Sequence, residues 1–154
     1  MPSQTPLYDQ DFHAWTLETA KLLRKQSWNQ VEWEAVIEEI ESLGKSQERE
    51  LASRLFQLIM HLLKWIAQPS RRQTSRSWTT SIRNQRRELG RLLRQSPSLR
   101  RQVEDVLVEE YATAVDEAMH QTGLPREAFP PLCPWTAPQV LENDFWPETF
   151  PEGL

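Results

Sequence analysis

Cysteine and glycine are scarce in this chain of 154 residues. Its single cysteine, Cys133, excludes an internal disulfide and a zinc site built from several thiolates, and it fits a reducing compartment. The four glycines, Gly44, Gly90, Gly123 and Gly153, are too scattered to form a glycine-rich phosphate loop, and no serine lies in a nucleophile-elbow motif. The sequence therefore lacks the usual signatures of nucleotide binding and serine hydrolysis.

Long apolar runs are also missing. Gln57 and Lys64 interrupt the most apolar stretch, and no basic segment followed by an apolar run stands at the N-terminus. We therefore expect neither a signal peptide nor a membrane-spanning helix, and we expect a cytoplasmic protein with no membrane partner. A chain of this length typically forms one domain with a sizeable core, so we predict a single helical domain over residues 1–154.

Apolar residues recur at helical spacing through most of the chain, and no alternating pattern predicts a strand. Asn29 and Gly44 are read as the N-cap and C-cap of the second helix, and Pro69 ends the third. We predict an all-α fold, a single bundle of five helices. These span about residues 9–26, 29–43, 46–67, 78–95 and 97–123.

The residues that follow the last predicted helix differ in composition. Seven of the eleven prolines fall between Pro125 and Pro151, and they alternate with five aromatic residues, whereas flexible linkers are poor in aromatics. We predict that residues 124–151, called here the C-terminal strap, are ordered and lie across the helices. One short helix is expected in residues 137–144.

Several motifs in a fixed order give a family resemblance. They are EWEAVIEEIESLGKSQERELASRLFQLIMHLLKW, then SWTTSIRNQRREL, SPSLRRQVEDVLVEEY and FPPLCPW. Together they resemble the bacterial family called domain of unknown function 29, which is common in cyanobacteria. The resemblance covers about Tyr8 to Pro147. It implies a helical fold and a bacterial, cyanobacterial source, and it implies no activity and no site residues.

A polar seam is predicted between the second and third helices. Glu34, Glu38 and Glu41 line one edge of the second helix, and His61 borders the apolar face of the third. Antiparallel packing of the two helices would bring a carboxylate to His61, either as a pair for proton transfer or metal binding or as a structural hydrogen bond. Arg86, at the edge of the fourth helix's apolar face, is a further candidate for this seam.

Three histidines are candidates for a metal site. His13, His61 and His120 lie on three different predicted helices, and three imidazoles suit zinc, iron or nickel. Helical periodicity does not establish whether they converge. The sequence therefore assigns no metal, no cofactor and no catalytic residue.

Arginine is the most unevenly distributed residue. The net charge is −4, yet residues 71–101 contain ten arginines against one acid, Glu88, a local charge of +9 that leaves −13 elsewhere. On the fourth predicted helix the residues opposite the apolar face form what we call the arginine face, a surface suited to phosphates or carboxylates. Its members are Arg83, Arg87, Arg91 and Arg94.

Three functions remain open on these observations. The leading hypothesis is a non-catalytic protein-interaction module that docks a partner, such as an acidic protein, through the arginine face or the C-terminal strap. The second is a nucleic-acid-binding protein that uses the same face. The third is an enzyme or metal-binding protein that uses His61 with the glutamates of the second helix. The sequence does not determine the oligomeric state.

Overall fold

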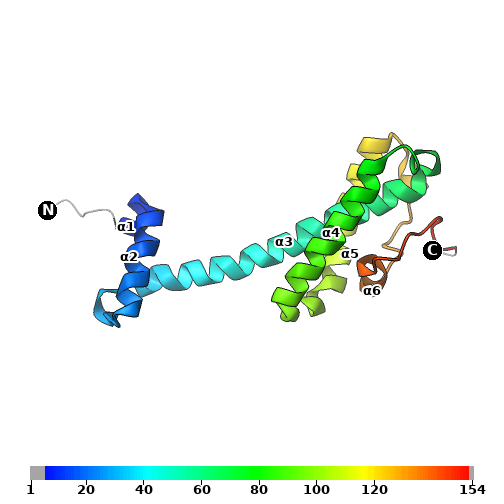
Figure 1. Ribbon diagram of the computed structural model, residues 1–154. Helices are drawn as coiled ribbons and strands as arrows, with labels where there is room; N and C mark the ends of the chain where they lie inside the picture. The colour runs from blue at the N-terminus through cyan, green and yellow to red at the C-terminus, as the bar shows by residue number, and fades with distance from the viewer. Residues whose placement is uncertain (1–5, 153–154) are drawn as a thin grey trace. The chain divides into compact units, whose positions relative to one another are not determined.

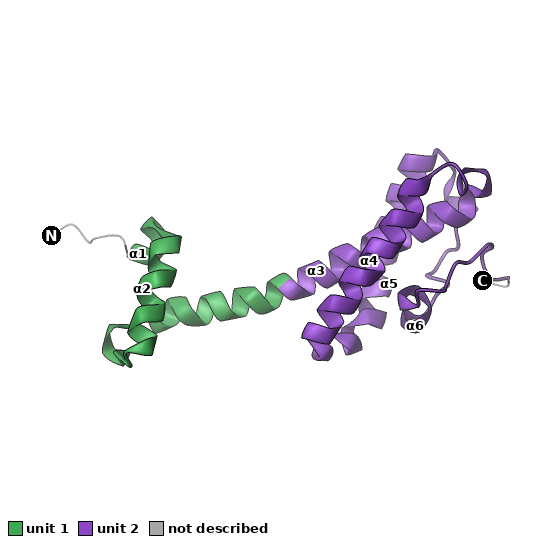
Figure 2. Ribbon diagram, in the orientation of Figure 1, with its two compact units in different colours: residues 1–46 green, residues 47–154 purple. Residues whose placement is uncertain are grey.

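The computed structural model describes residues 6–152, which contain α-helices, short 3-10 helices and irregular connections (Figure 1). No strand occurs within this range, so the predicted all-α class is confirmed. The chain divides into two compact units, residues 1–46 and 47–154 (Figure 2). A single domain over residues 1–154 stays a prediction, and residues 1–5 and 153–154 lie outside the described residues.

The first unit contains α1 (Leu7–Gln10), α2 (Phe12–Arg24), a 3-10 helix (Trp28–Gln30) and the beginning of α3. We predicted one helix over residues 9–26, but the chain breaks at Asp11. Asp11 adopts an extended conformation, and its carboxylate accepts a hydrogen bond from the Ala14 amide at 3.0 Å. Asp11 thus acts as the N-cap of α2 and separates it from α1.

Helix α3 (Trp33–Ala67) is a single helix of 35 residues. The predicted helices at residues 29–43 and 46–67 are therefore one element, and the predicted C-cap at Gly44 is wrong. Gly44 has no positive φ, and good helix formers surround it. One interior glycine costs only about 1 kcal/mol relative to alanine, which is too little to end such a helix without a following proline.

The second unit contains the remainder of α3, α4 (Arg76–Gln95), α5 (Val103–Thr122) and α6 (Ala137–Leu141). Three short 3-10 helices, Pro69–Arg71, Pro97–Gln102 and Arg126–Ala128, join them. Gly123 ends α5 as predicted, with a left-handed φ of 73° that glycine adopts without a Cβ clash. The predicted short helix is also present, since α6 begins with a capping box between Thr136 and Gln139.

The core of the second unit is built from α3, α4, α5 and the C-terminal strap. Leu55, Leu58 and Leu62 of α3 are fully buried against Ile82 and Leu89 of α4, within one apolar cluster. From the strap, Phe129, Trp135 and Val140 join the same cluster. The predicted five-helix count is replaced by six α-helices within residues 6–152, four of which are longer than two turns. None of the helices in that range is long and apolar enough to cross a lipid bilayer.

Candidate functional site

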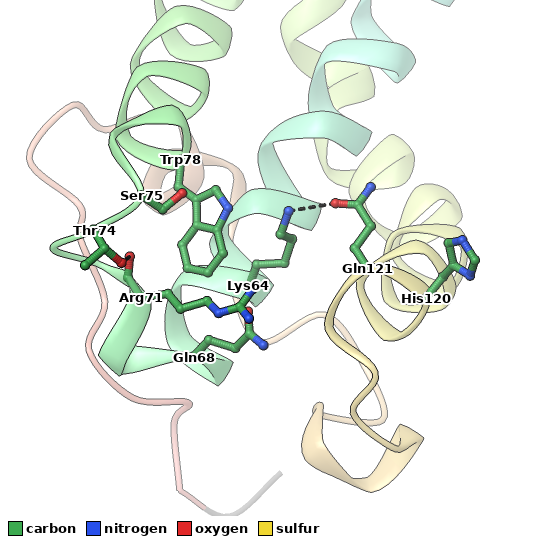
Figure 3. Close-up of a pocket in the computed structure, with 8 residues that line it drawn as sticks. All are labelled: Lys64, Gln68, Arg71, Thr74, Ser75, Trp78, His120 and Gln121. Atoms are coloured by element: carbon green, nitrogen blue, oxygen red, sulfur yellow. Dashed lines mark hydrogen bonds between the residues drawn. The ribbon is translucent and has the colours of Figure 1, made fainter.

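A polar cavity of about 610 Å³ lies in the second unit, where the end of α3, the start of α4 and the end of α5 meet (Figure 3). We call it the Lys64 pocket. Thr74 and Ser75, which immediately precede α4, form part of its wall. Its remaining lining residues are Lys64, Gln68, Arg71, Trp78, His120 and Gln121.

Lys64 occupies a defined position in this pocket. Its ammonium group donates a hydrogen bond to Gln121 Oε1 (Figure 3), with a donor–acceptor distance of 2.6 Å. The same group lies 5.2 Å from the centroid of the Trp78 ring. Gln121 in turn donates to a Glu117 carboxylate oxygen at 2.6 Å, which orients the amide. Burial lowers the pKa of Lys64, because desolvation disfavours the charged amine.

The predicted arginine face is exposed, but acidic residues already bind part of it. Arg91 Nε lies 2.9 Å from a Glu88 oxygen, and Arg91 Nη2 lies 3.2 Å from a Glu50 oxygen on α3. Arg87 lies 3.7 Å from Glu88. Arg83 packs its guanidinium 5.7 Å from the ring of Trp146. The positive charge of α4 is thus partly neutralised by neighbours on α3 and α4.

A shallow hollow of about 350 Å³ opens on the same face, between the side chains of Arg83 and Arg87. Thr80, Ser81 and Asn84 complete its lining. Hydroxyl, amide and guanidinium groups all donate hydrogen bonds, so this hollow is suited to an acidic group. Arg94 is also exposed, at the C-terminal end of α4.

The polar seam was predicted between two antiparallel helices, but the structure has one helix, α3, in their place. Glu34, Glu38 and Glu41 are exposed in the first unit, whereas His61 belongs to the second. All four residues lie along α3, so the antiparallel helix pair assumed in the prediction is absent from this segment. His61 Nδ1 instead lies 2.7 Å from the Gln57 carbonyl one turn earlier, and burial lowers the pKa of the imidazole.

Arg86 is buried and binds the C-terminal strap. Its Nε donates to the Val140 carbonyl at 2.9 Å, and its Nη2 donates to the Phe145 carbonyl at 2.7 Å. The guanidinium carbon also lies 5.3 Å from the Trp146 ring centroid. Burial lowers the pKa of Arg86 to about 10. Arg86 is thus a structural residue here and makes no hydrogen bond to His61 among the described contacts.

Arginine supplies the hydrogen bonds that the strap's own backbone cannot. Proline has no amide hydrogen, so a proline-rich segment has more carbonyl acceptors than amide donors. Arg72 donates to the Glu148 carbonyl at 2.7 Å, and Tyr111 donates its hydroxyl to the Pro130 carbonyl at 2.7 Å. This pairing was not predicted from the sequence, although an arginine-rich and a proline-rich segment occur together in it.

Within residues 6–152, no group of three or more histidine, cysteine or carboxylate side chains is placed to hold a metal ion. His13 lies in the first unit, while His61 and His120 lie in the second. The thiol of Cys133 is half-buried and contacts the Trp135 carbonyl oxygen at 3.5 Å, and burial raises its pKa.

The first unit exposes a row of apolar side chains at helical spacing on α3. Trp33, Ile37, Ile40 and Leu43 remain 45%, 46%, 62% and 68% exposed, respectively. We call these four residues the α3 stripe. Their helical spacing predicts one apolar face correctly, but spacing alone does not reveal whether another element covers that face.

The comparisons with known proteins give a family and no close relative. The family model described as Domain of unknown function DUF29 matches residues 7–146. No curated protein and no solved structure matches the chain significantly. Since the matched range covers most of the chain, this protein belongs to the DUF29 family.

Proposed function

We propose that this protein is a non-catalytic interaction module that docks a partner protein through the α3 stripe. The main support for this proposal is an exposed apolar row on one helix, made of Trp33, Ile37, Ile40 and Leu43. Together they present a few hundred Å² of apolar surface, comparable to the largest patch on a typical monomer, and patches of that size commonly mark interaction sites.

The spacing of the stripe supports docking of a helical or groove-forming partner. Positions 33, 37 and 40 follow the i, i+4, i+7 pattern by which a helix presents apolar anchors to a groove. The same spacing continues along α3 into Leu51, Leu55 and Leu58, which are fully buried by the second unit's own helices. In the second unit other helices bury the apolar residues of this pattern. In the first unit no described residue buries the α3 stripe.

The charges beside the stripe indicate the chemistry of the partner. Glu34 and Glu41 border the stripe on one side and Glu39 on the other, and no lysine or arginine occurs between Glu32 and Lys45. Two copies joined through this face would oppose carboxylates to carboxylates, which disfavours a homodimer. The partner surface therefore carries apolar side chains bordered by lysine or arginine.

Binding of two synthetic amphipathic helices tests this proposal. Both carry the same leucine row, bordered in one by lysine and in the other by glutamate. We expect fluorescence anisotropy to show binding of the lysine-bordered helix only, because the borders of the stripe are acidic. Exchange of Ile37 and Ile40 for serine should weaken this binding by about tenfold or more, since each loses roughly 1 kcal/mol of apolar contact.

Val108→Ser is the matched control for these exchanges, because Val108 on α5 is an exposed apolar residue, at 72%, outside the stripe. Its affinity for the lysine-bordered helix should equal that of the unchanged protein. Equal affinity for the two synthetic helices would contradict the docking proposal. A loss of affinity in Val108→Ser as large as that in the Ile37 and Ile40 exchanges would contradict it too.

The arginine face supports a second candidate surface, for an acidic protein segment. The supporting observation is the open hollow between Arg83 and Arg87, whose five lining residues include no carboxylate. Arg91 pairs with Glu50 at 3.2 Å and with Glu88 at 2.9 Å, whereas Arg87 lies farther from Glu88, at 3.7 Å. Arg83 makes no ion pair among the described residues, so this end of α4 is the less neutralised part of the face. Nucleic acid remains the alternative ligand for the same arginines.

Titration with labelled polyglutamate and with single-stranded RNA separates these two ligands. We expect polyglutamate to bind, and Arg83→Gln with Arg87→Gln to weaken it, whereas Arg100→Gln with Arg101→Gln removes equal charge elsewhere and should have little effect. RNA binding should be weak and should vanish by physiological salt, because the chain's overall charge is negative. RNA binding that persists at that salt would favour the nucleic-acid candidate instead.

A further inference from the structure

We propose that the Lys64 pocket binds a small organic molecule through a dianionic oxyanion group, of which a phosphate monoester is the simplest example. The pocket lies within residues 64–121 of the second unit, and the α3 stripe lies in the first. This inference therefore goes beyond the proposed function and does not depend on it.

The lining of the pocket consists of hydrogen-bond donors and cations. Lys64 and Arg71 supply two positive charges, and Gln68, Thr74, Ser75 and Gln121 supply neutral donors. None of the eight lining residues is a carboxylate, although the chain as a whole has more acidic than basic residues. A cavity lined by basic and neutral donor side chains, in a chain that is acidic overall, is suited to binding an anion.

Lys64 is held in place before any ligand arrives. One proton of its ammonium group is donated to Gln121 Oε1 at 2.6 Å, and the group lies 5.2 Å from the Trp78 ring centroid. An ammonium has three donors, so further protons remain for a ligand oxygen. Fixing the side chain in advance reduces the ordering entropy lost on binding. The negative charge of a bound anion would also stabilise the ammonium form, which burial disfavours.

Charge matching favours a dianion over a monoanion. A phosphate monoester carries about −1.5 to −2 charges near neutral pH, which Lys64 and Arg71 together would neutralise. A single carboxylate carries about half the charge of the dianion, so the two cations would attract it less strongly. The planar fork of Arg71 also fits two phosphate oxygens at once. His120 also lines the pocket, and an imidazole N–H can donate a further hydrogen bond.

The size of the cavity indicates an organic molecule rather than a free ion. Its volume of about 610 Å³ falls within the range of small-molecule sites. Trp78 gives the cavity one apolar side, and Figure 3 shows its indole beside the Lys64 side chain. This side would contact the organic part of the ligand while Arg71 and Lys64 hold its oxyanion.

Isothermal titration calorimetry with phenyl phosphate and with benzoate tests the inference, since the two probes share a ring and differ in charge. We expect phenyl phosphate to bind at least tenfold more tightly than benzoate. Arg71→Gln should weaken phenyl phosphate binding at least tenfold, because Arg71 is exposed and its loss spares the fold while removing one pocket charge. Arg101→Gln, an exposed arginine outside the pocket, should leave the affinity unchanged.

A second readout locates the binding event. In ¹H–¹⁵N spectra the indole N–H signal of Trp78, assigned by its loss in Trp78→Phe, should shift on addition of phenyl phosphate and remain in place with Arg71→Gln. No saturable binding at millimolar phenyl phosphate, equal affinity for benzoate, or an equal loss in Arg101→Gln would overturn the proposal. Binding of the synthetic helices to the α3 stripe would be unaffected by any of these results.

Discussion

Truncation after Gly123 should leave a protein that aggregates or melts at a markedly lower temperature. The deleted strap contributes Phe129, Trp135 and Val140 to the core of the second unit. Burial of each large apolar side chain stabilises the fold by about 1.5–3 kcal/mol before ordering costs, and typical domains are stable by only about 5–15 kcal/mol. Losing three such side chains therefore removes much of the unit's stability. Thermal melts followed by circular dichroism measure the effect.

A single substitution within the strap tests whether burial of its side chains, rather than the length of the chain, stabilises the second unit. Trp135→Ala should lower the free energy of unfolding by about 3–5 kcal/mol, because Trp135 is only 5% exposed. Leu132→Ala is the matched control, since Leu132 is 72% exposed in the same segment and should change stability by less than about 0.5 kcal/mol. If the truncated chain melts within a few degrees of the full chain, the strap does not stabilise the fold.

Arg86→Ala should destabilise the second unit strongly, although it removes a charge from a basic segment. The exchange leaves the Val140 and Phe145 carbonyls without their donors. Hydrogen bonds to charged groups contribute about 1.5–3 kcal/mol each, so we expect the free energy of unfolding to fall by roughly 3 kcal/mol or more. Chemical denaturation followed by tryptophan fluorescence measures this difference.

Two further variants isolate the cause. Arg87→Ala removes the same charge at the next position, where the side chain is 72% exposed, and should change stability by about 0.5 kcal/mol or less. Arg86→Met keeps most of the buried volume but provides no donor, so it should remain destabilising by about 2 kcal/mol or more. Equal stability of Arg86→Met and the unchanged protein would show that the strap does not need these hydrogen bonds.

Local sequence signals predicted the elements whose ends are encoded by local chemistry. Gly123 ends α5 because the left-handed C-cap favours glycine. The predicted break between residues 95 and 97 is also present, since α4 ends at Gln95 and a 3-10 helix begins at Pro97. The prediction that Gly44 ends a helix was wrong, because local chemistry at that position does not require the helix to end. A glycine ends a helix reliably only when the chain also turns there, and nothing in the neighbouring residues requires a turn.

The sites were harder to predict because their residues come from separate segments. The Lys64 pocket joins residues near the ends of α3 and α5 with the loop before α4, and no local pattern relates these positions. Arg86 was recognised at the edge of an apolar face, but its partners lie more than fifty positions away in the strap. For the α3 stripe, helical periodicity indicates one apolar face, but it does not indicate that this face is exposed.

Photocrosslinking from the α3 stripe in native cells tests the interaction proposal most directly. A photoreactive phenylalanine derivative replaces Ile40 in one strain and Val108 in another, since both side chains are largely exposed. We predict one discrete crosslinked product from position 40, joined to a partner segment of apolar residues bordered by lysine or arginine, and no such product from position 108. No product from position 40, the same product from both positions, or a crosslink only to a second copy of this chain would contradict the proposal.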